Sequence, residues 1–280
     1  MYASLDYRNP GEMMPAALVA AIYSIAACID NKPQPFATNT IVPRYPEPRV
    51  FFEEAMQLLL EGSAEDKSSQ LSNAFTPSIL NCQVLTILAL QQHGVAEYSR
   101  AAVLCGIASS MAIELRLHRP TTGDPLNGEV RSRLWWNLYI LEKMLSCEMG
   151  RPVLLRAEET DCPYPSASEA DEFELMSVYI RDRGQTDQVR NTPIKLRTIS
   201  ALHTTIKLSV IMERIAREIY GLADRRAIRE NQAAGEDKRI TLWLAMREWE
   251  RALDASALRL DLSDALTSVP ATVTNCVVST

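Results

Sequence analysis

The chain has 280 residues, of which 47% are hydrophobic and only ten are glycines, which is ample for a buried core in one large or two ordinary domains. It carries 29 basic and 35 acidic residues, a formal charge of −6. No segment concentrates Lys and Arg as a groove along a phosphate backbone would require, so the chain itself is not expected to bind nucleic acid.

Cysteines and histidines are the residues to test for disulfides or a metal site. No two cysteines form a C-x-x-C pair, and no histidine lies in an H-E-x-x-H or similar ligand spacing. Most of the cysteines fall on apolar helical segments, which predicts reduced core thiols in an intracellular protein and no metal or cofactor in this chain. The cysteines are Cys28, Cys82, Cys105, Cys147, Cys162 and Cys276, and the histidines are His93, His118 and His203.

An uncharged run covers residues 13–29. A membrane span needs about 20 apolar residues and a signal peptide needs a positive n-region, whereas here Arg8 is offset by two acidic neighbours. Pro15 stands at a helix-start position, so a buried first helix is favoured over a signal peptide or a membrane span. Five prolines then predict an extended connection over residues 31–48.

Three more helices are predicted before residue 120. Residues 49–61 place their large apolar side chains on one face, and residues 79–93 are apolar nearly all round, with Thr76 or Ser78 as the N-cap. Residues 97–118 carry a row of large apolar side chains flanked by small residues. Small side chains allow close approach, so this helix is expected to pack tightly against the next one.

The most apolar segment is residues 129–149, which predict a long helix surrounded by others. Large side chains recur there at steps of three and four, beside two adjacent tryptophans, and Gly150 and Pro152 form a stop signal. The main apolar row is Leu134, Leu138, Leu141, Leu145 and Met149. The positions left for water are Arg133, Asn137, Lys143 and Glu148.

The region after this helix is acidic and rich in proline. Residues 158–174 contain seven acidic residues and no Lys or Arg. A solvated acidic loop is the favoured interpretation; the alternative is that residues 161–165 fold back over the helices, with Cys162 and Tyr164 as anchors. The early part of residues 175–195 predicts a short helix, and residues 181–191 a flexible surface segment.

Helical periodicity returns at Thr198 and again in residues 238–258. The first of these segments carries the row Leu208, Ile211, Ile215, Ile219 and Leu222, and the second carries Leu242, Met246, Trp249 and Leu253. Both rows predict amphipathic helices that pack into the core. Residues 263–280 keep no such pattern and are expected to form an irregular tail.

Catalytic motifs are absent from the sequence: it has no G-x-S-x-G, no phosphate-binding G-x-x-x-x-G-K-S/T loop and no G-x-G-x-x-G after a strand. Arg131, Arg133 and Arg151 could clamp a carboxylate or phosphate ligand. The favoured interpretation is structural, with these arginines pairing with carboxylates such as Asp161 or stacking on rings. Arg151 in particular is predicted to be anchored by an internal carboxylate or backbone carbonyl.

One family resemblance rests on the central helix. The run R-x-R-L-W-W-x-L-Y-x-L-E-K-x-L-S, closing on G-R-P and followed by D-x-P-x-P, resembles the signature of the fungal-specific transcription factor domain, the middle regulatory region of binuclear zinc-cluster regulators. Arg116 stands where that family usually has glycine, and Glu142 where aspartate is commoner. The residues that carry the resemblance, taken as structural, are Leu117, His118, Arg119, Arg131, Arg133, Leu134, Trp135, Trp136, Gly150, Arg151, Pro152 and Asp161.

The resemblance implies an all-α, multi-helix regulatory domain over residues 1–262, built around the Trp-Trp helix, with a proline-rich connection at 31–48 and an acidic, polar loop region at 151–197. It implies a nuclear regulator of transcription that acts through response to a small-molecule inducer, interdomain inhibition or cofactor contact. Its implied partners are transcription-machinery proteins or a homo- or heterodimer partner. The family's zinc cluster needs six closely spaced cysteines, which this chain lacks, so zinc and DNA are expected only through a separate module. The chain is also expected to end before the family domain does.

Two other functions stay open. The first is a stand-alone helical interaction protein, or a heterodimerising regulator without DNA binding of its own. The second, less favoured, is an enzyme on a helical scaffold, which would need convergent carboxylates or histidines in a polar pocket.

Overall fold

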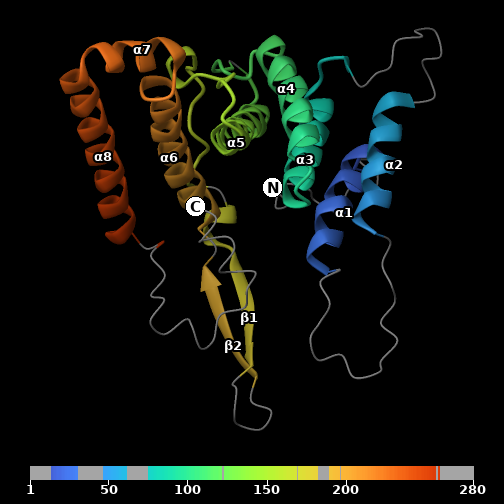
Figure 1. Ribbon diagram of the computed structural model, residues 1–280. Coiled ribbons are helices and arrows are strands. Elements are labelled where there is room, and N and C mark those ends of the chain that lie inside the picture. Colours follow the sequence, from blue (N-terminus) through green and yellow to red (C-terminus); the bar gives the residue numbers. More distant parts are fainter. Residues whose placement is uncertain are drawn as a thin grey trace. The chain divides into compact units, whose positions relative to one another are not determined.

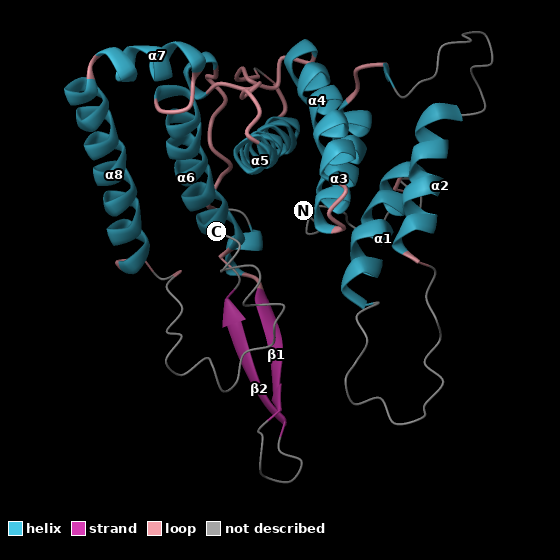
Figure 2. Ribbon diagram, viewed as in Figure 1, coloured by secondary structure: helices cyan, strands magenta, loops and turns pink. Residues whose placement is uncertain are grey.

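The computed structural model describes residues 14–30, 47–61, 75–121, 123–168, 170–181, 189–195, 197–256 and 258, and these form an all-α fold with one small hairpin (Figures 1 and 2). The described residues divide between Pro163 and Tyr164 into two compact units. We call the part before this point the N-terminal unit and the part after it the C-terminal unit.

The N-terminal unit contains the five predicted helices. They are α1 (Ala16–Asp30), α2 (Pro48–Glu61), α3 (Ile79–Gly94), α4 (Tyr98–Glu114) and α5 (Pro125–Met149). Helix α1 packs against α2 and α3, α3 against α4, and α4 against α5, as the small residues of α4 predict. No helix of the described segments has the length and apolarity needed to cross a membrane.

Helix ends in this unit follow local capping chemistry. Ser78 caps α3 and accepts a hydrogen bond from the Asn81 amide at 3.0 Å, as predicted. Helix α5 begins four residues earlier than expected, because Asp124 caps the Leu126 amide at 3.2 Å and Pro125 occupies the first turn. It ends at Gly150, whose φ of 61° is left-handed, as the stop signal predicts.

Helix α5 is buried around most of its circumference. The predicted apolar row is buried except for Met149, and both tryptophans are at most 3% exposed. Lys143 was expected to face water but is fully buried, because a carboxylate, a carbonyl and an aromatic ring surround its ammonium group.

The C-terminal unit begins with a short hairpin. Strands β1 (Leu175–Arg181) and β2 (Val189–Lys195) are antiparallel, with Leu175 opposite Lys195 and Arg181 opposite Val189. The prediction of a helix early in residues 175–195 is therefore wrong. The run Val178-Tyr179-Ile180 has high strand propensity, and Pro193 is tolerated because a two-stranded sheet consists only of edge strands.

Three helices complete this unit: α6 (Thr198–Glu218), α7 (Leu222–Glu230) and α8 (Gln232–Asp254). One apolar row was expected to run from Leu208 to Leu222, but α6 ends four residues before Leu222. Leu222 is instead the first residue of α7, and it is 68% exposed. Helix α8 starts six residues before the predicted position, because the Asn231 side chain accepts a hydrogen bond from the Ala234 amide at 3.2 Å.

Helices α6 and α8 lie side by side and share the core of the C-terminal unit (Figure 1). Ile206 and Leu242 are buried, and the Trp249 indole donates a hydrogen bond to the Thr204 carbonyl at 2.9 Å. The irregular tail expected at 263–280, Cys276, and most of the proline-rich connection fall outside the described residues.

Candidate functional site around helix α5

The corner between α4 and α5 holds the first group of signature residues. Leu117 is fully buried, and the His118 ring lies against Trp135 with centroids 5.7 Å apart. The Arg131 guanidinium donates to the Leu115 carbonyl at 2.6 Å and more weakly to the Arg116 carbonyl at 3.4 Å. These contacts close the end of α4 onto the start of α5. Arg131 thus binds backbone carbonyls, whereas a carboxylate or an aromatic ring was the expected partner.

Three polar atoms in the same corner are buried and find no hydrogen-bond partner among the described residues. They are His118 Nδ1, Arg131 Nε and Trp135 Nε1. Burial lowers the pKa of His118, and the charge of the neighbouring Arg119 lowers it further. The imidazole is therefore neutral at physiological pH, and its packing on Trp135 is a contact between uncharged rings.

Arg116 adopts a left-handed conformation with φ of 55°. The amides of Arg116 and Leu117 bond back to the Ile113 and Ala112 carbonyls at 2.9 Å each, which is the pattern of a Schellman helix end. A glycine meets this requirement without steric cost, whereas an arginine has a Cβ to accommodate. This geometry explains why glycine is expected here and arginine is unusual.

The segment after the G-R-P stop folds back onto these helices. The His118 carbonyl accepts hydrogen bonds from the Asp161 amide at 2.9 Å and from the Thr160 hydroxyl at 3.1 Å. Arg119 and Asp161 form an ion pair, but both side chains are more than half exposed, so this pair adds little stability. The backbone contacts do most of the anchoring.

Two α5 side chains hold the end of this segment. The Pro163 carbonyl accepts hydrogen bonds from the Ser132 hydroxyl and from the Trp136 indole, the latter at 3.0 Å. Cys162 is 7% exposed, and burial raises the pKa of its thiol to about 11. We call residues 150–163 the strap.

Each of the two interpretations of the acidic region describes part of the strap. Glu158, Glu159 and Asp161 are exposed, as a solvated loop predicts, while Cys162 and the backbone fold back as the alternative predicts. Tyr164 lies beyond the strap and is 43% exposed, and its ring contacts His203 in the C-terminal unit with centroids 5.4 Å apart.

A buried ion pair secures the start of the strap. Lys143 Nζ donates to the Glu142 carboxylate and to the Leu155 carbonyl, and it lies 4.5 Å from the centre of the Tyr139 ring. The other carboxylate oxygen of Glu142 accepts from the Ser146 hydroxyl at 2.7 Å and from the Leu154 amide at 2.9 Å. Sequence reasoning missed this network, although adjacent opposite charges in a very apolar helix were a usable signal.

The remaining signature arginines have different surroundings. Arg133 pairs with Glu129 at 2.7 Å, as their spacing suggests, and both side chains are at most 16% exposed. Arg151 and Pro152 are exposed, and within the described segments no carboxylate or carbonyl accepts a hydrogen bond from the Arg151 guanidinium. The predicted internal anchor for Arg151 is therefore wrong. The kind of carbonyl anchor predicted for Arg151 is found at Arg131 instead.

Residues that could ligate a metal do not cluster in the part of the chain that the structure describes. In the described ranges, no group of three or more His, Cys, Asp or Glu residues could hold a metal ion. The free thiols come from different elements, with Cys82 on α3, Cys105 on α4 and Cys162 in the strap. What the α5 region does physically is hold connecting segments against a helical core.

The fold and these contacts define a helical domain in which polar side chains of the central helix bind the segments that connect its helices. The model of the fungal-specific transcription factor domain matches residues 4–256, and the chain belongs to this family. The family and the relatives it resembles are transcription regulators. No solved structure matches the chain.

Three relatives illustrate the similarity. An uncharacterized transcriptional regulatory protein of Schizosaccharomyces pombe is 34% identical over 94 residues, 33% of this chain and 15% of that protein. The Zn(2)-C6 fungal-type transcription factor FTF1c of Fusarium oxysporum is 28% identical over 110 residues, 35% of this chain and 12% of that protein.

The activatory protein CHA4 of Saccharomyces cerevisiae is 26% identical over 213 residues, 72% of this chain and 30% of that protein. The chain thus matches between 12% and 30% of the length of these three relatives.

Proposed function

We propose that residues 1–262 act as the regulatory, middle homology domain of a fungal zinc-cluster-type transcription factor, with the signature residues in a structural role. The observation that carries this proposal is the family match over residues 4–256. The α5 region supports it, because its charged side chains are used to fasten the strap and the α4–α5 corner.

The proposal includes the cellular setting. The domain works in the nucleus, contacts transcription-machinery proteins or a dimer partner, and senses a small-molecule inducer. Zinc and DNA enter only through a zinc-cluster module separate from these residues, as the name of the Fusarium relative suggests for that protein. The domain is not an enzyme, consistent with a family of transcription regulators.

A tethered reporter tests the regulatory role. The chain is inserted between a heterologous DNA-binding domain and an activation domain, and reporter output in yeast is compared with an insert carrying Leu138→Pro. Proline in the middle of α5 breaks the helix while keeping length and composition. A regulatory domain should change output by about fivefold or more relative to the broken insert; equal output from both inserts would sink the proposal.

The alternative is a stand-alone helical interaction protein that heterodimerises without DNA binding of its own. Reading the genomic sequence upstream of the Met1 codon separates the two. Six closely spaced cysteines beside a basic arm in the same reading frame favour the zinc-cluster factor. An in-frame stop codon with no such cluster favours the alternative.

A further inference from the structure

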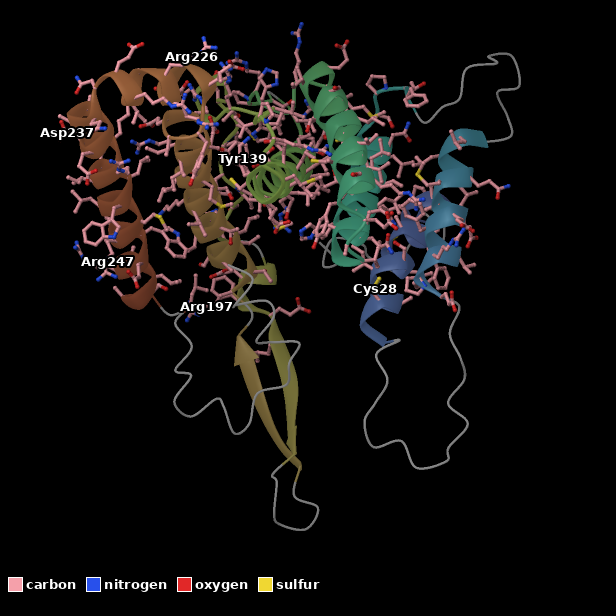
Figure 3. All side chains as sticks on the ribbon, in the orientation of Figure 1. Cys28, Tyr139, Arg197, Arg226, Asp237 and Arg247 are labelled. Atoms are coloured by element: carbon pink, nitrogen blue, oxygen red, sulfur yellow. The ribbon has the colours of Figure 1, made fainter. Side chains whose placement is uncertain are left out.

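Helix α7 presents a basic face to solvent. Leu222, Arg225, Arg226 and Arg229 follow the spacing i, i+3, i+4 and i+7, which places them on one side of the helix, and all four are exposed. Figure 3 shows the Arg226 side chain pointing away from the α7 ribbon. We call these four residues the α7 basic face.

The opposite side of α7 is fixed on α8. Asp224 pairs with Lys238 at 2.5 Å, and Ile228 packs on Gly235, where a Cβ would come within 2.6 Å of the isoleucine. These two contacts set the rotation of α7 about its axis. The basic face is therefore held outward by packing on its far side.

The arginines of this face differ from their neighbours in having no carboxylate. On α6 and α8, by contrast, Arg214, Arg217, Arg239 and Arg247 each pair with a glutamate on their own helix. Throughout the described segments, no ion pair or hydrogen bond to the side chains of Arg225, Arg226 and Arg229 is found. Three uncompensated charges on one helix face stand out in a chain whose formal charge is −6.

Apolar surface lies at the start of the same helix. Tyr220 and Leu222 are each 68% exposed, next to the turn at Gly221 that joins α6 to α7. Guanidinium groups bind carboxylates with paired, directional hydrogen bonds, and an adjacent exposed tyrosine and leucine offer an apolar contact. The surface therefore combines the two features that recognise an acidic segment carrying apolar residues.

We propose that the α7 basic face binds an acidic peptide segment of a partner protein, in which carboxylates pair with the three arginines and an apolar side chain packs on Tyr220 and Leu222. This binding role goes beyond the proposed regulatory function and does not depend on it. Charge complementarity is what selects the partner.

A nucleic acid is the less suitable ligand for this face. The three arginines span only about one helical turn, roughly 6 Å. Exposed carboxylates of Glu230, Glu236 and Asp237 lie just beyond, on the end of α7 and the start of α8. A duplex that extends past three contacts would meet these negative charges. A short peptide avoids them.

Fluorescence anisotropy with the full 280-residue chain tests the proposal. The probe is a fluorescein-labelled peptide of repeating Glu-Glu-Leu, and its matched control has Gln in place of Glu. The variant R225A/R226A/R229A should bind the acidic probe about tenfold more weakly or worse, since three exposed charge pairs are lost. Leu222→Ser should weaken binding without changing its salt dependence.

A control variant separates this face from general charge. R100A/K207A/R251A removes three exposed basic side chains from other helix surfaces and should leave binding unchanged. The charge-reversed R225E/R226E/R229E should lose the acidic probe and gain binding to a Lys-Lys-Leu peptide. Circular dichroism should show that every variant keeps its helices.

Two results would overturn the proposal. The first is equal weakening by the α7 triple variant and the control triple variant. The second is binding of a short DNA duplex through the same arginines as tightly as the acidic peptide, which would assign the face to phosphate backbones.

Discussion

At the residue scale, the backbone at Arg116 constrains side-chain choice more than any contact of the side chain does. The φ of 55° ends α4 and lets the Leu117 amide return to Ala112 at 2.9 Å. The Arg116 carbonyl in turn faces the Arg131 guanidinium. A replacement at this position must keep the left-handed backbone conformation. Removing the Arg116 side chain should cost little packing energy, because that side chain is exposed.

We predict that Arg116→Gly stabilises the protein by about 1 kcal/mol. Glycine adopts the left-handed conformation without the steric cost of a Cβ, and this gain outweighs its greater freedom in the unfolded chain. Urea unfolding followed by circular dichroism measures the change. The matched control is Arg100→Gly in the first turn of α4, which should destabilise the protein by less than about 1 kcal/mol. A loss of stability from Arg116→Gly would show that the arginine side chain matters.

At the element scale, the strap depends on a small number of polar contacts with α5. Trp136 donates its indole N–H to the Pro163 carbonyl at 3.0 Å, whereas the buried Trp135 indole N–H has no partner in the part of the chain that the structure describes. The two rings are adjacent and equally buried, yet only one is bonded to the strap. This difference provides a matched pair of substitutions.

We predict that Trp136→Phe loosens the strap and Trp135→Phe does not. Both changes shrink a buried ring, but only the first removes a hydrogen bond, worth about 1 kcal/mol. Trypsin cleavage after the exposed Arg156 should therefore become about fivefold faster in Trp136→Phe, because cleavage follows the population of the open strap. Equal acceleration in both variants would show that ring volume, and not the hydrogen bond, holds the strap.

The elements also show what the sequence could predict. Helices α1 to α5 followed from apolar periodicity and from caps such as Ser78 and Gly150, because both signals are local. The hairpin at 175–195 was not predicted, because the apolar residues of its first strand are equally compatible with a short helix unless their strand propensity is weighed.

Contacts within the site were harder to predict, because their partners are distant in sequence. Arg131 lies 16 residues from Leu115 and Trp136 lies 27 residues from Pro163, so no local pattern reveals which carbonyl each donor reaches. Arg151 and Lys143 show the same limit in opposite directions. Sequence neighbours predict an internal anchor for Arg151 and a solvent-facing position for Lys143. In the folded protein Arg151 is exposed and Lys143 is buried.

At the scale of the whole molecule, buried thiols link stability to pH. Burial raises the pKa of Cys82 and of Cys105 to about 12 from 9.0, and the Glu142 charge adds to the effect at Cys105. Cys82 on α3 lies 3.5 Å from the Ala108 carbonyl of α4, and both thiols are at most 2% exposed. The helix interface therefore holds these thiols in their neutral form.

The sign of the pH effect follows from the raised pKa values. Below about pH 9 both thiols are protonated in the folded and the unfolded chain, so their contribution to stability is fully present. Between about pH 9 and 12 the unfolded chain releases these protons and the folded chain keeps them. The free energy of unfolding should fall through this window by about 1.4 kcal/mol per pH unit for each thiol.

We predict that C82A/C105A has a shallower alkaline loss of stability than the parent protein. Urea unfolding followed by circular dichroism at a series of pH values measures the slopes, which should differ by roughly 2 to 3 kcal/mol per pH unit above pH 9. Below pH 8 the two slopes should be the same, since the thiols do not titrate there, and this range is the internal control. Parallel slopes above pH 9 would mean that water reaches the thiols of the α3–α4 interface before the chain unfolds.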